Sequence, residues 1–183
     1  MESFQWVTGT LMMVSSLGMT RMLTSMVALF RSRSQSQLDW IPMVWALSLF
    51  YSLLEFSYAL TGLPTTGVAW TFQHFLMLFA VVILLFLASA LILPPSLDKG
   101  ESMRTSFERD GRWALAFLAL YEFLTIGINQ YFWHSPLASF PTYFNLALAL
   151  VALGSLFTRS RKAECILTLT FAGLEAFSIL LLG

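Results

Sequence analysis

Six long apolar stretches alternate with short polar breaks along the chain, a pattern typical of helices that cross a bilayer. A helix needs about 20 mainly apolar residues to span the hydrocarbon core. The stretches that qualify cover residues 5–30, 40–61, 69–94, 113–132, 139–157 and 164–182. We therefore predict an all-α polytopic membrane protein, with a single transmembrane domain over residues 1–183 that folds as a six-helix bundle.

The breaks between these stretches carry turn signals and charge. Pro94 and Pro95 are expected to end the third helix, because proline lacks the backbone N–H and crowds the preceding turn. Within the longest break, residues 101–112 place Met103 and Phe107 four positions apart. This segment is expected to be either a short interfacial helix with both side chains facing lipid, or a solvated linker. The charged connections are residues 31–39, 95–112 and 158–163.

The positive charges predict the orientation of the helices. Nine of the ten Lys and Arg residues lie in or beside the three charged connections, and the tenth, Arg21, lies inside the first predicted helix. Because cytoplasmic loops carry an excess of Lys and Arg, these connections are expected to be cytoplasmic and both termini non-cytoplasmic. Five tryptophans fall near predicted helix ends, where interfacial rings belong: Trp6, Trp40, Trp70, Trp113 and Trp133.

Composition supports a membrane protein and excludes several other classes. Hydrophobic residues make up 57% of the chain and charged residues 11%, compared with about 25% charged in soluble domains. The net charge is zero, so no nucleic-acid partner is expected. The single cysteine, Cys165, allows no internal disulfide or Cys-pair metal site. No phosphate loop, nucleophile elbow or HExxH motif occurs, and we expect no catalytic residues, metal or cofactor.

The residues that point to function are the ionisable ones inside the predicted spans: Arg21, Glu55, His74, Glu122 and Glu175. A charge near the bilayer centre costs at least ~2.5–3.5 kcal/mol, so such groups face the bundle interior. Arg21, Glu122 and Glu175 are expected near mid-membrane, where Arg21 could form an ion pair or gate with either glutamate. Glu55 and His74 are expected in the outer half. The four acidic and histidine side chains are our candidates for an ion or proton pathway, although an Arg–Glu pair could equally serve only to fix helix register.

Uncharged polar residues are expected to join Glu55 and His74 at the outer level if their helix faces converge. This predicted outer vestibule consists of Tyr58, Gln73, Asn129, Gln130 and Asn145. His134, next to Pro136 in an outer loop, is expected to be a surface residue.

The first 125 residues contain several short motifs: Leu17-Gly-Met-Thr20 before a basic loop, Trp45-Ala-Leu, Trp70-Thr-Phe with Phe75-Leu, Leu87-Ala-Ser-Ala-Leu-Ile-Leu-Pro94, and Arg112-Trp113 with Leu118-Ala-Leu-Tyr121. Together they resemble the motifs of an uncharacterised family of small bacterial multi-pass, six-helix membrane proteins. The resemblance implies a bacterial inner (cytoplasmic) membrane. It implies no particular chemistry.

Three functions are compatible with this pattern. The first is transport or ion translocation through a polar bundle interior, in a homo-oligomer or with a membrane-protein partner. The second is a non-catalytic subunit or scaffold of a larger membrane complex. The third is a membrane-embedded enzyme acting on a lipid or quinone. A water-accessible cavity lined by Glu55 and His74 would favour transport, and a dry, fully paired interior would favour the scaffold.

Overall fold

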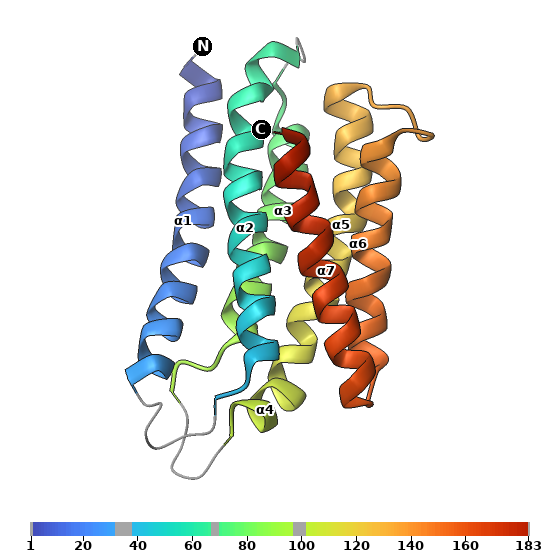
Figure 1. Ribbon diagram of the computed structural model, residues 1–183. Coiled ribbons are helices and arrows are strands. Elements are labelled where there is room, and N and C mark those ends of the chain that lie inside the picture. Colours follow the sequence, from blue (N-terminus) through green and yellow to red (C-terminus); the bar gives the residue numbers. More distant parts are fainter. Residues whose placement is uncertain (1, 32–37, 67–69, 97–101, 183) are drawn as a thin grey trace.

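The computed structural model describes residues 2–31, 38–66, 70–96 and 102–182. The described part is all-α (Figure 1). The long helices are α1 (Glu2–Arg31), α2 (Trp40–Gly62), α3 (Phe72–Ile92), α5 (Arg112–Trp133), α6 (Phe140–Phe157) and α7 (Arg161–Leu182). The short elements are the 3-10 helix η1 (Leu63–Thr66), α4 (Met103–Ser106) and the π-helical turn η2 (Phe107–Gly111).

Six helices are long and apolar enough to cross a membrane, which confirms the prediction of an all-α chain with six candidate spans. The long helices begin and end within a turn of the predicted bounds. Both ends of the chain lie at the same end of the bundle, together with the connection between α5 and α6 (Figure 1). Large apolar side chains are exposed around the outside, among them Leu47, Leu120, Leu150 and Leu169. A lipid bilayer is the solvent that suits such a surface.

Local sequence explains several helix ends. The carboxylate of Asp39 caps α2 by accepting a hydrogen bond from the Ile41 N–H at 3.1 Å. Thr71 caps α3 through a reciprocal pair of hydrogen bonds with His74. Helix α5 stops at His134, whose φ of 50° is left-handed and cannot continue the helix.

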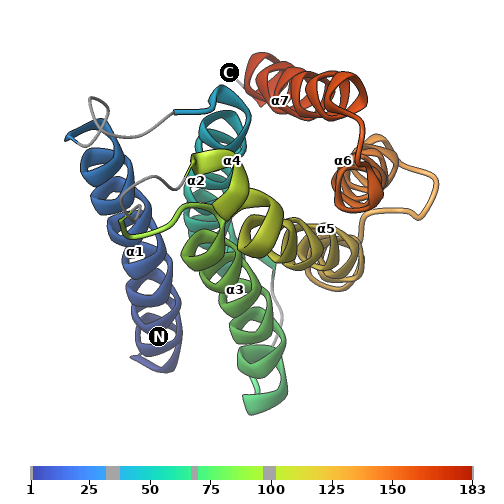
Figure 2. The same ribbon diagram turned by 90° about the horizontal axis from the view of Figure 1, so that it is seen from below.

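Five of the long helices form a ring. Seen along the bundle, α2, α3, α5, α6 and α7 each pack against two neighbours in the order α2–α3–α5–α6–α7 and back to α2 (Figure 2). Helix α1 lies outside this ring and packs against α2 and α3. The ring, and not all six helices, therefore encloses the interior in which a functional site is expected.

Helix α1 contacts the ring through residues at heptad spacing, in which small side chains lie between large ones. Its buried positions are Leu11, Ser15, Gly18, Met22, Ser25 and Leu29. The Ser15 hydroxyl bonds to the Leu53 carbonyl oxygen at 3.2 Å and to the Ser57 hydroxyl at 2.8 Å. A Cβ on Gly18 would lie 3.2 Å from the Ser89 hydroxyl and 3.3 Å from a methyl group of Leu53, so side chains of the ring pack directly against this glycine.

The segment before α5 differs from both alternatives expected for it. Residues 103–133 form one continuous helical stretch. Met103 is fully buried and Phe107 is 4% exposed, so both pack into the protein core and neither is available to face lipid. A Cβ on Gly111 would overlap the Phe107 ring, which explains why glycine occupies the end of this π-helical turn.

Candidate functional site

A cavity of about 470 Å³ lies inside the ring. It is partly open, and its wall comes from α2, α3, α5 and α6, with Ser178 from α7. Along α5 the lining runs from Tyr121 to Trp133, a length of about 18 Å at the usual rise per residue. The cavity therefore extends from the middle of the bundle to the end at which the termini lie. The polar side chains that line it are Glu55, Tyr121, Glu122, Thr125, Asn129, Asn145 and Ser178.

Glu122 is the buried acid of this cavity. Its side chain comes from α5, and the residue is only 4% exposed. Within residues 2–31, 38–66, 70–96 and 102–182, no hydrogen bond or ion pair satisfies its carboxyl group. Glu55 enters from α2 on the same cavity and is more exposed. Glu122 interacts electrostatically with both Glu55 and Glu175, so the fold brings three carboxyl groups from three helices toward one region.

Glu175 is held differently. It lies on α7, is 6% exposed, and accepts a hydrogen bond from the Ser52 hydroxyl at 3.1 Å. One turn later, Ser178 bonds to the Tyr51 hydroxyl at 3.0 Å and to the Glu175 carbonyl oxygen at 2.8 Å. These contacts attach α7 to α2 directly beside the cavity. Glu175 thus has a protein partner, whereas Glu122 has none among the residues described.

The structure does not bring Arg21 to either glutamate. Arg21 lies on α1, outside the ring, and its Nη1 donates to the Ser25 hydroxyl at 2.6 Å. In the described part of the chain no ion pair connects it to Glu122 or Glu175. The reason is positional: α1 packs against α2 and α3, and these helices stand between α1 and the cavity.

His74 does not lie on the cavity wall, so it is not brought together with Glu55. It is 8% exposed, and its Nδ1 accepts the Thr71 N–H at 3.3 Å. Because Nδ1 accepts, the ring proton lies on Nε2, which donates to the Tyr131 hydroxyl at 2.6 Å. His74 therefore completes a helix cap, which is a sufficient structural role for it.

The residues of the predicted outer vestibule separate into two groups. Asn129 and Asn145 line the cavity. Tyr58, which is 76% exposed, and Gln73 lie on outward faces of their helices. Gln130 is part-buried away from the cavity, and its side-chain nitrogen finds no partner among the described residues. His134 is exposed, as expected from its loop position.

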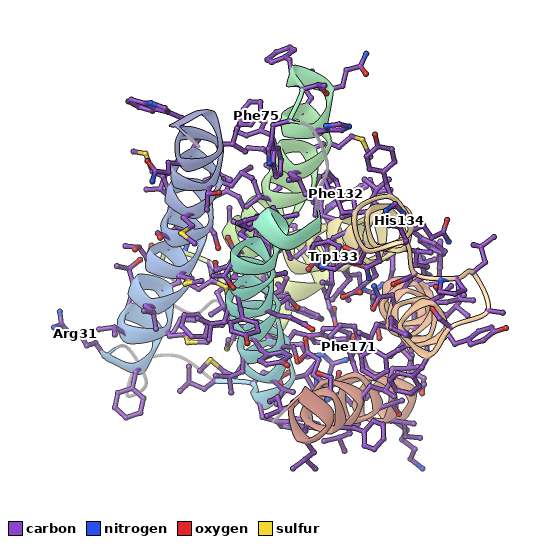
Figure 3. All side chains as sticks on the ribbon, turned by 90° about the horizontal axis from the view of Figure 1, so that it is seen from above. Arg31, Phe75, Phe132, Trp133, His134 and Phe171 are labelled. Carbon is purple, nitrogen blue, oxygen red and sulfur yellow. The ribbon has the colours of Figure 1, made fainter. Side chains whose placement is uncertain are left out.

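Aromatic residues of the cavity were not recognised from the sequence as site residues. Trp133 points from the end of α5 toward α2 (Figure 3), where its Nε1 lies 3.8 Å from the place of a Cβ on Gly62. Tyr121, Phe140 and Phe144 complete this aromatic part of the wall.

The spacing of polar residues in α5 could have indicated which face of the helix lines the cavity. Glu122, Thr125 and Asn129 recur at i, i+3 and i+7 and so share a helix face. That face lines the cavity.

The opposite end of the ring is tied by charged side chains. Arg161 Nη2 bonds to Asp39 Oδ1 at 2.6 Å and connects the starts of α7 and α2. Arg112 Nη2 donates to the Thr158 carbonyl oxygen at 2.8 Å and lies 3.8 Å from Glu164 Oε1, which connects α5, α6 and α7. The cavity lining contains none of these residues. Polar bonds therefore connect the helices at this end, whereas the cavity lies toward the other.

The Asp39 carboxylate is stabilised in its charged form by these contacts. Burial alone would raise its pKa. The hydrogen bonds from Arg161 and the Ile41 N–H, together with the positive charge of Arg161, outweigh this effect and hold the pKa of Asp39 below its usual value.

No family model, curated protein or solved structure matches the chain. The resemblance to small bacterial membrane proteins therefore identifies no family. The architecture itself, a multi-pass membrane protein with six candidate spans, follows from helix length and hydropathy.

Proposed function

We propose that the chain is a transporter or ion-translocating bundle of a bacterial cytoplasmic membrane, and that Glu55 and Glu122 bind the translocated species. The carboxyl group of Glu122 carries this proposal. It is buried, it lines a cavity of ligand size, and no described residue bonds to it. A charge near the bilayer centre costs at least ~2.5–3.5 kcal/mol. A group that brings this cost and has no hydrogen-bond partner among the described residues is expected to bind a ligand.

The distribution of charge supports access from outside. The ion pairs of Arg112 and Arg161 lie at the end of the ring that the cavity does not reach. If the positive-inside rule holds here, this end faces the cytoplasm. The cavity and both termini then belong to the non-cytoplasmic side, and the charged contacts form the closed inner end of the path.

The carboxyl groups take different parts in this proposal. Glu55 is the more exposed and meets the incoming ion or substrate first, and Glu122 holds it deeper in the cavity. Glu175 links ligand binding in the cavity to the contact between α7 and α2, because its carboxyl group accepts a hydrogen bond from Ser52 of α2. His74 and Arg21 are left out of the path because neither lines the cavity.

Flux measurements in proteoliposomes test the proposal. The native protein is compared with Glu55→Gln, Glu122→Gln and Glu175→Gln under proton, sodium and potassium gradients. Glu108→Gln is the matched control, because Glu108 pairs with Arg104 on the surface outside the cavity. We expect flux in the native protein and the control, and its loss in Glu122→Gln protein that still elutes as a single folded species.

The opposite result is also informative. Absence of flux under every gradient would refute the proposal. The better interpretation would then be a scaffold of a larger membrane complex, with the glutamates as structural groups. Co-purifying proteins and the mass of the detergent-solubilised complex would then be decisive. The same mass measurement tests the expectation of a homo-oligomer or a membrane-protein partner.

A further inference from the structure

The cavity has features that select a chemical class of ligand. We infer that it binds an organic cation with an apolar, largely aromatic body, an inference that rests on the proposed role of Glu55 and Glu122 in binding. Three properties of the wall lead to this conclusion: its size, the sign of its charge, and the composition of the remaining surface.

Size argues against a bare inorganic ion as the sole occupant. The cavity volume of about 470 Å³ lies within the range of about 300–1,000 Å³ that is typical of pockets for small organic molecules. One water molecule takes up about 30 Å³ in the liquid. A single dehydrated ion would leave most of the space unfilled, and the apolar part of the wall offers no hydrogen-bond partners to water that would fill the rest.

Charge argues for a cation. Glu55 and Glu122 both line the cavity, and Glu175 interacts electrostatically with Glu122. No Lys or Arg lines the wall as the structure describes it. On α5 the nearest arginine to Glu122 is Arg112, ten residues earlier in the sequence and so about 15 Å away along the helix axis. An anionic ligand would find no countercharge here, while a cation would neutralise an otherwise unpaired buried acid.

The remaining wall suits an apolar body. It is formed mainly by aliphatic and aromatic side chains, with Phe56, Tyr121, Trp133, Phe140 and Phe144 as the aromatic members. Aromatic faces attract organic cations through their quadrupole, in addition to burying apolar surface. Asn129 and Asn145 can hydrogen-bond polar substituents of the ligand. A small apolar body with one positive charge matches this arrangement.

Two probes of the same shape and opposite charge provide the test. Tetraphenylphosphonium and tetraphenylborate differ at the central atom, and both are titrated into the detergent-solubilised native chain by calorimetry, with empty micelles as the blank. We expect tetraphenylphosphonium to bind and tetraphenylborate not to bind. Glu122→Gln should weaken phosphonium binding at least about 30-fold, because truncating one partner of a buried charge pair removes its countercharge. The surface control Glu108→Gln should leave binding unchanged.

A second variant keeps the test independent of the folding of Glu122→Gln. Ala59→Trp places a large side chain in the cavity and leaves every carboxyl group in place. Loss of phosphonium binding in this variant supports the inference, and unchanged binding overturns it. Equal binding of the two probes, or native-like binding by folded Glu122→Gln, would also overturn it.

The failure of this inference can be distinguished from the failure of the transport proposal. Binding of the phosphonium without any flux would refute the transport proposal alone, whereas proton or metal-ion flux without phosphonium binding would refute this inference alone.

Discussion

Replacing Glu122 with methionine distinguishes a functional from a structural role for the buried acid, because the two roles predict opposite changes in stability. Glu122→Met preserves an unbranched side chain of similar length and removes the carboxyl group. Burying a polar group that lacks a hydrogen-bond partner costs about 1–3 kcal/mol in protein mutational data. Cavity water can hydrate part of the carboxyl group, so we take the lower half of that range, about 1–2 kcal/mol.

For a chain of this size, each kcal/mol shifts the melting temperature by about 2–4 °C, so Glu122→Met should melt about 2–8 °C higher than the native protein. The matched variant is Glu175→Met, whose carboxyl group accepts the Ser52 hydroxyl. Losing that hydrogen bond costs about 0.5–1.5 kcal/mol, so this variant should gain less than Glu122→Met or become less stable. Tryptophan fluorescence during a thermal ramp in detergent measures both.

A fall in stability of more than about 1 kcal/mol in Glu122→Met would refute this reasoning. Such a fall is expected when one member of a buried, satisfied network is removed and its partner is left unpaired. It would mean that Glu122 stabilises the bundle. The lack of a described hydrogen-bond partner for its carboxyl group would then no longer indicate a ligand site. A stabilised variant that has also lost flux would be the signature of a residue kept for function at the expense of stability.

Three further predictions concern the frame around the cavity. The arginine partner of Asp39 lowers the pKa of Asp39 in the folded protein. The stabilisation that the Asp39 carboxylate provides is therefore present above the pKa of the unfolded chain and is lost as the pH falls through the pKa of the folded protein. Between pH 6 and pH 3, the melting temperature of the native protein should converge with that of Asp39→Asn. Gly18→Leu should overpack α1 against the ring and cost about 1–3 kcal/mol, while Gly9→Leu, at a glycine with open space around it, should be neutral in the same melting assay. In a cysteine-free background, an impermeant maleimide added to intact spheroplasts should label Leu137→Cys and not Glu108→Cys; the reverse pattern would invert the proposed orientation.

The helices could be predicted from the sequence because their length is a local property. Bilayer thickness sets a minimum of about 20 apolar residues, and each stretch meets it independently of the others. The charged connections were predicted by the same reasoning, but residues 32–37 and 97–101 of them lie outside the described part of the chain. The reasoning failed for Met103 and Phe107, because a pair of apolar residues four positions apart looks the same whether it faces lipid or the protein core. Only the packing of η2 against α3 and α5 decides between these.

The site was only partly predictable, because helix rotation and neighbour order are set by packing. Glu55, Glu122, Asn129 and Asn145 were identified by polarity, and the structure brings them to one cavity. His74 was identified in the same way, yet its polarity is used locally in a helix cap. Arg21 shows the limit most clearly: its depth was predicted to match that of Glu122, but depth says nothing about which helices lie between two residues.

Helix α7 is the element whose contacts best suit a change of access. Beside the cavity it is attached to α2 by hydrogen bonds, from Ser52 to Glu175 and between Tyr51 and Ser178, and these can exchange partners with a ligand or with water. Nearer the other end, α7 is attached to α2 by the packing of Phe171 on Trp45, with ring centroids 4.7 Å apart, and by the bond between Arg161 and Asp39. Glu175 itself is not part of the cavity lining, but Ser178, one turn later and bonded to the Glu175 carbonyl oxygen, is; a ligand in the cavity would therefore meet this contact at Ser178. Under the proposed function, we therefore expect ligand binding to loosen the cavity end of α7 more than its inner end, which is the geometry that a hinge requires.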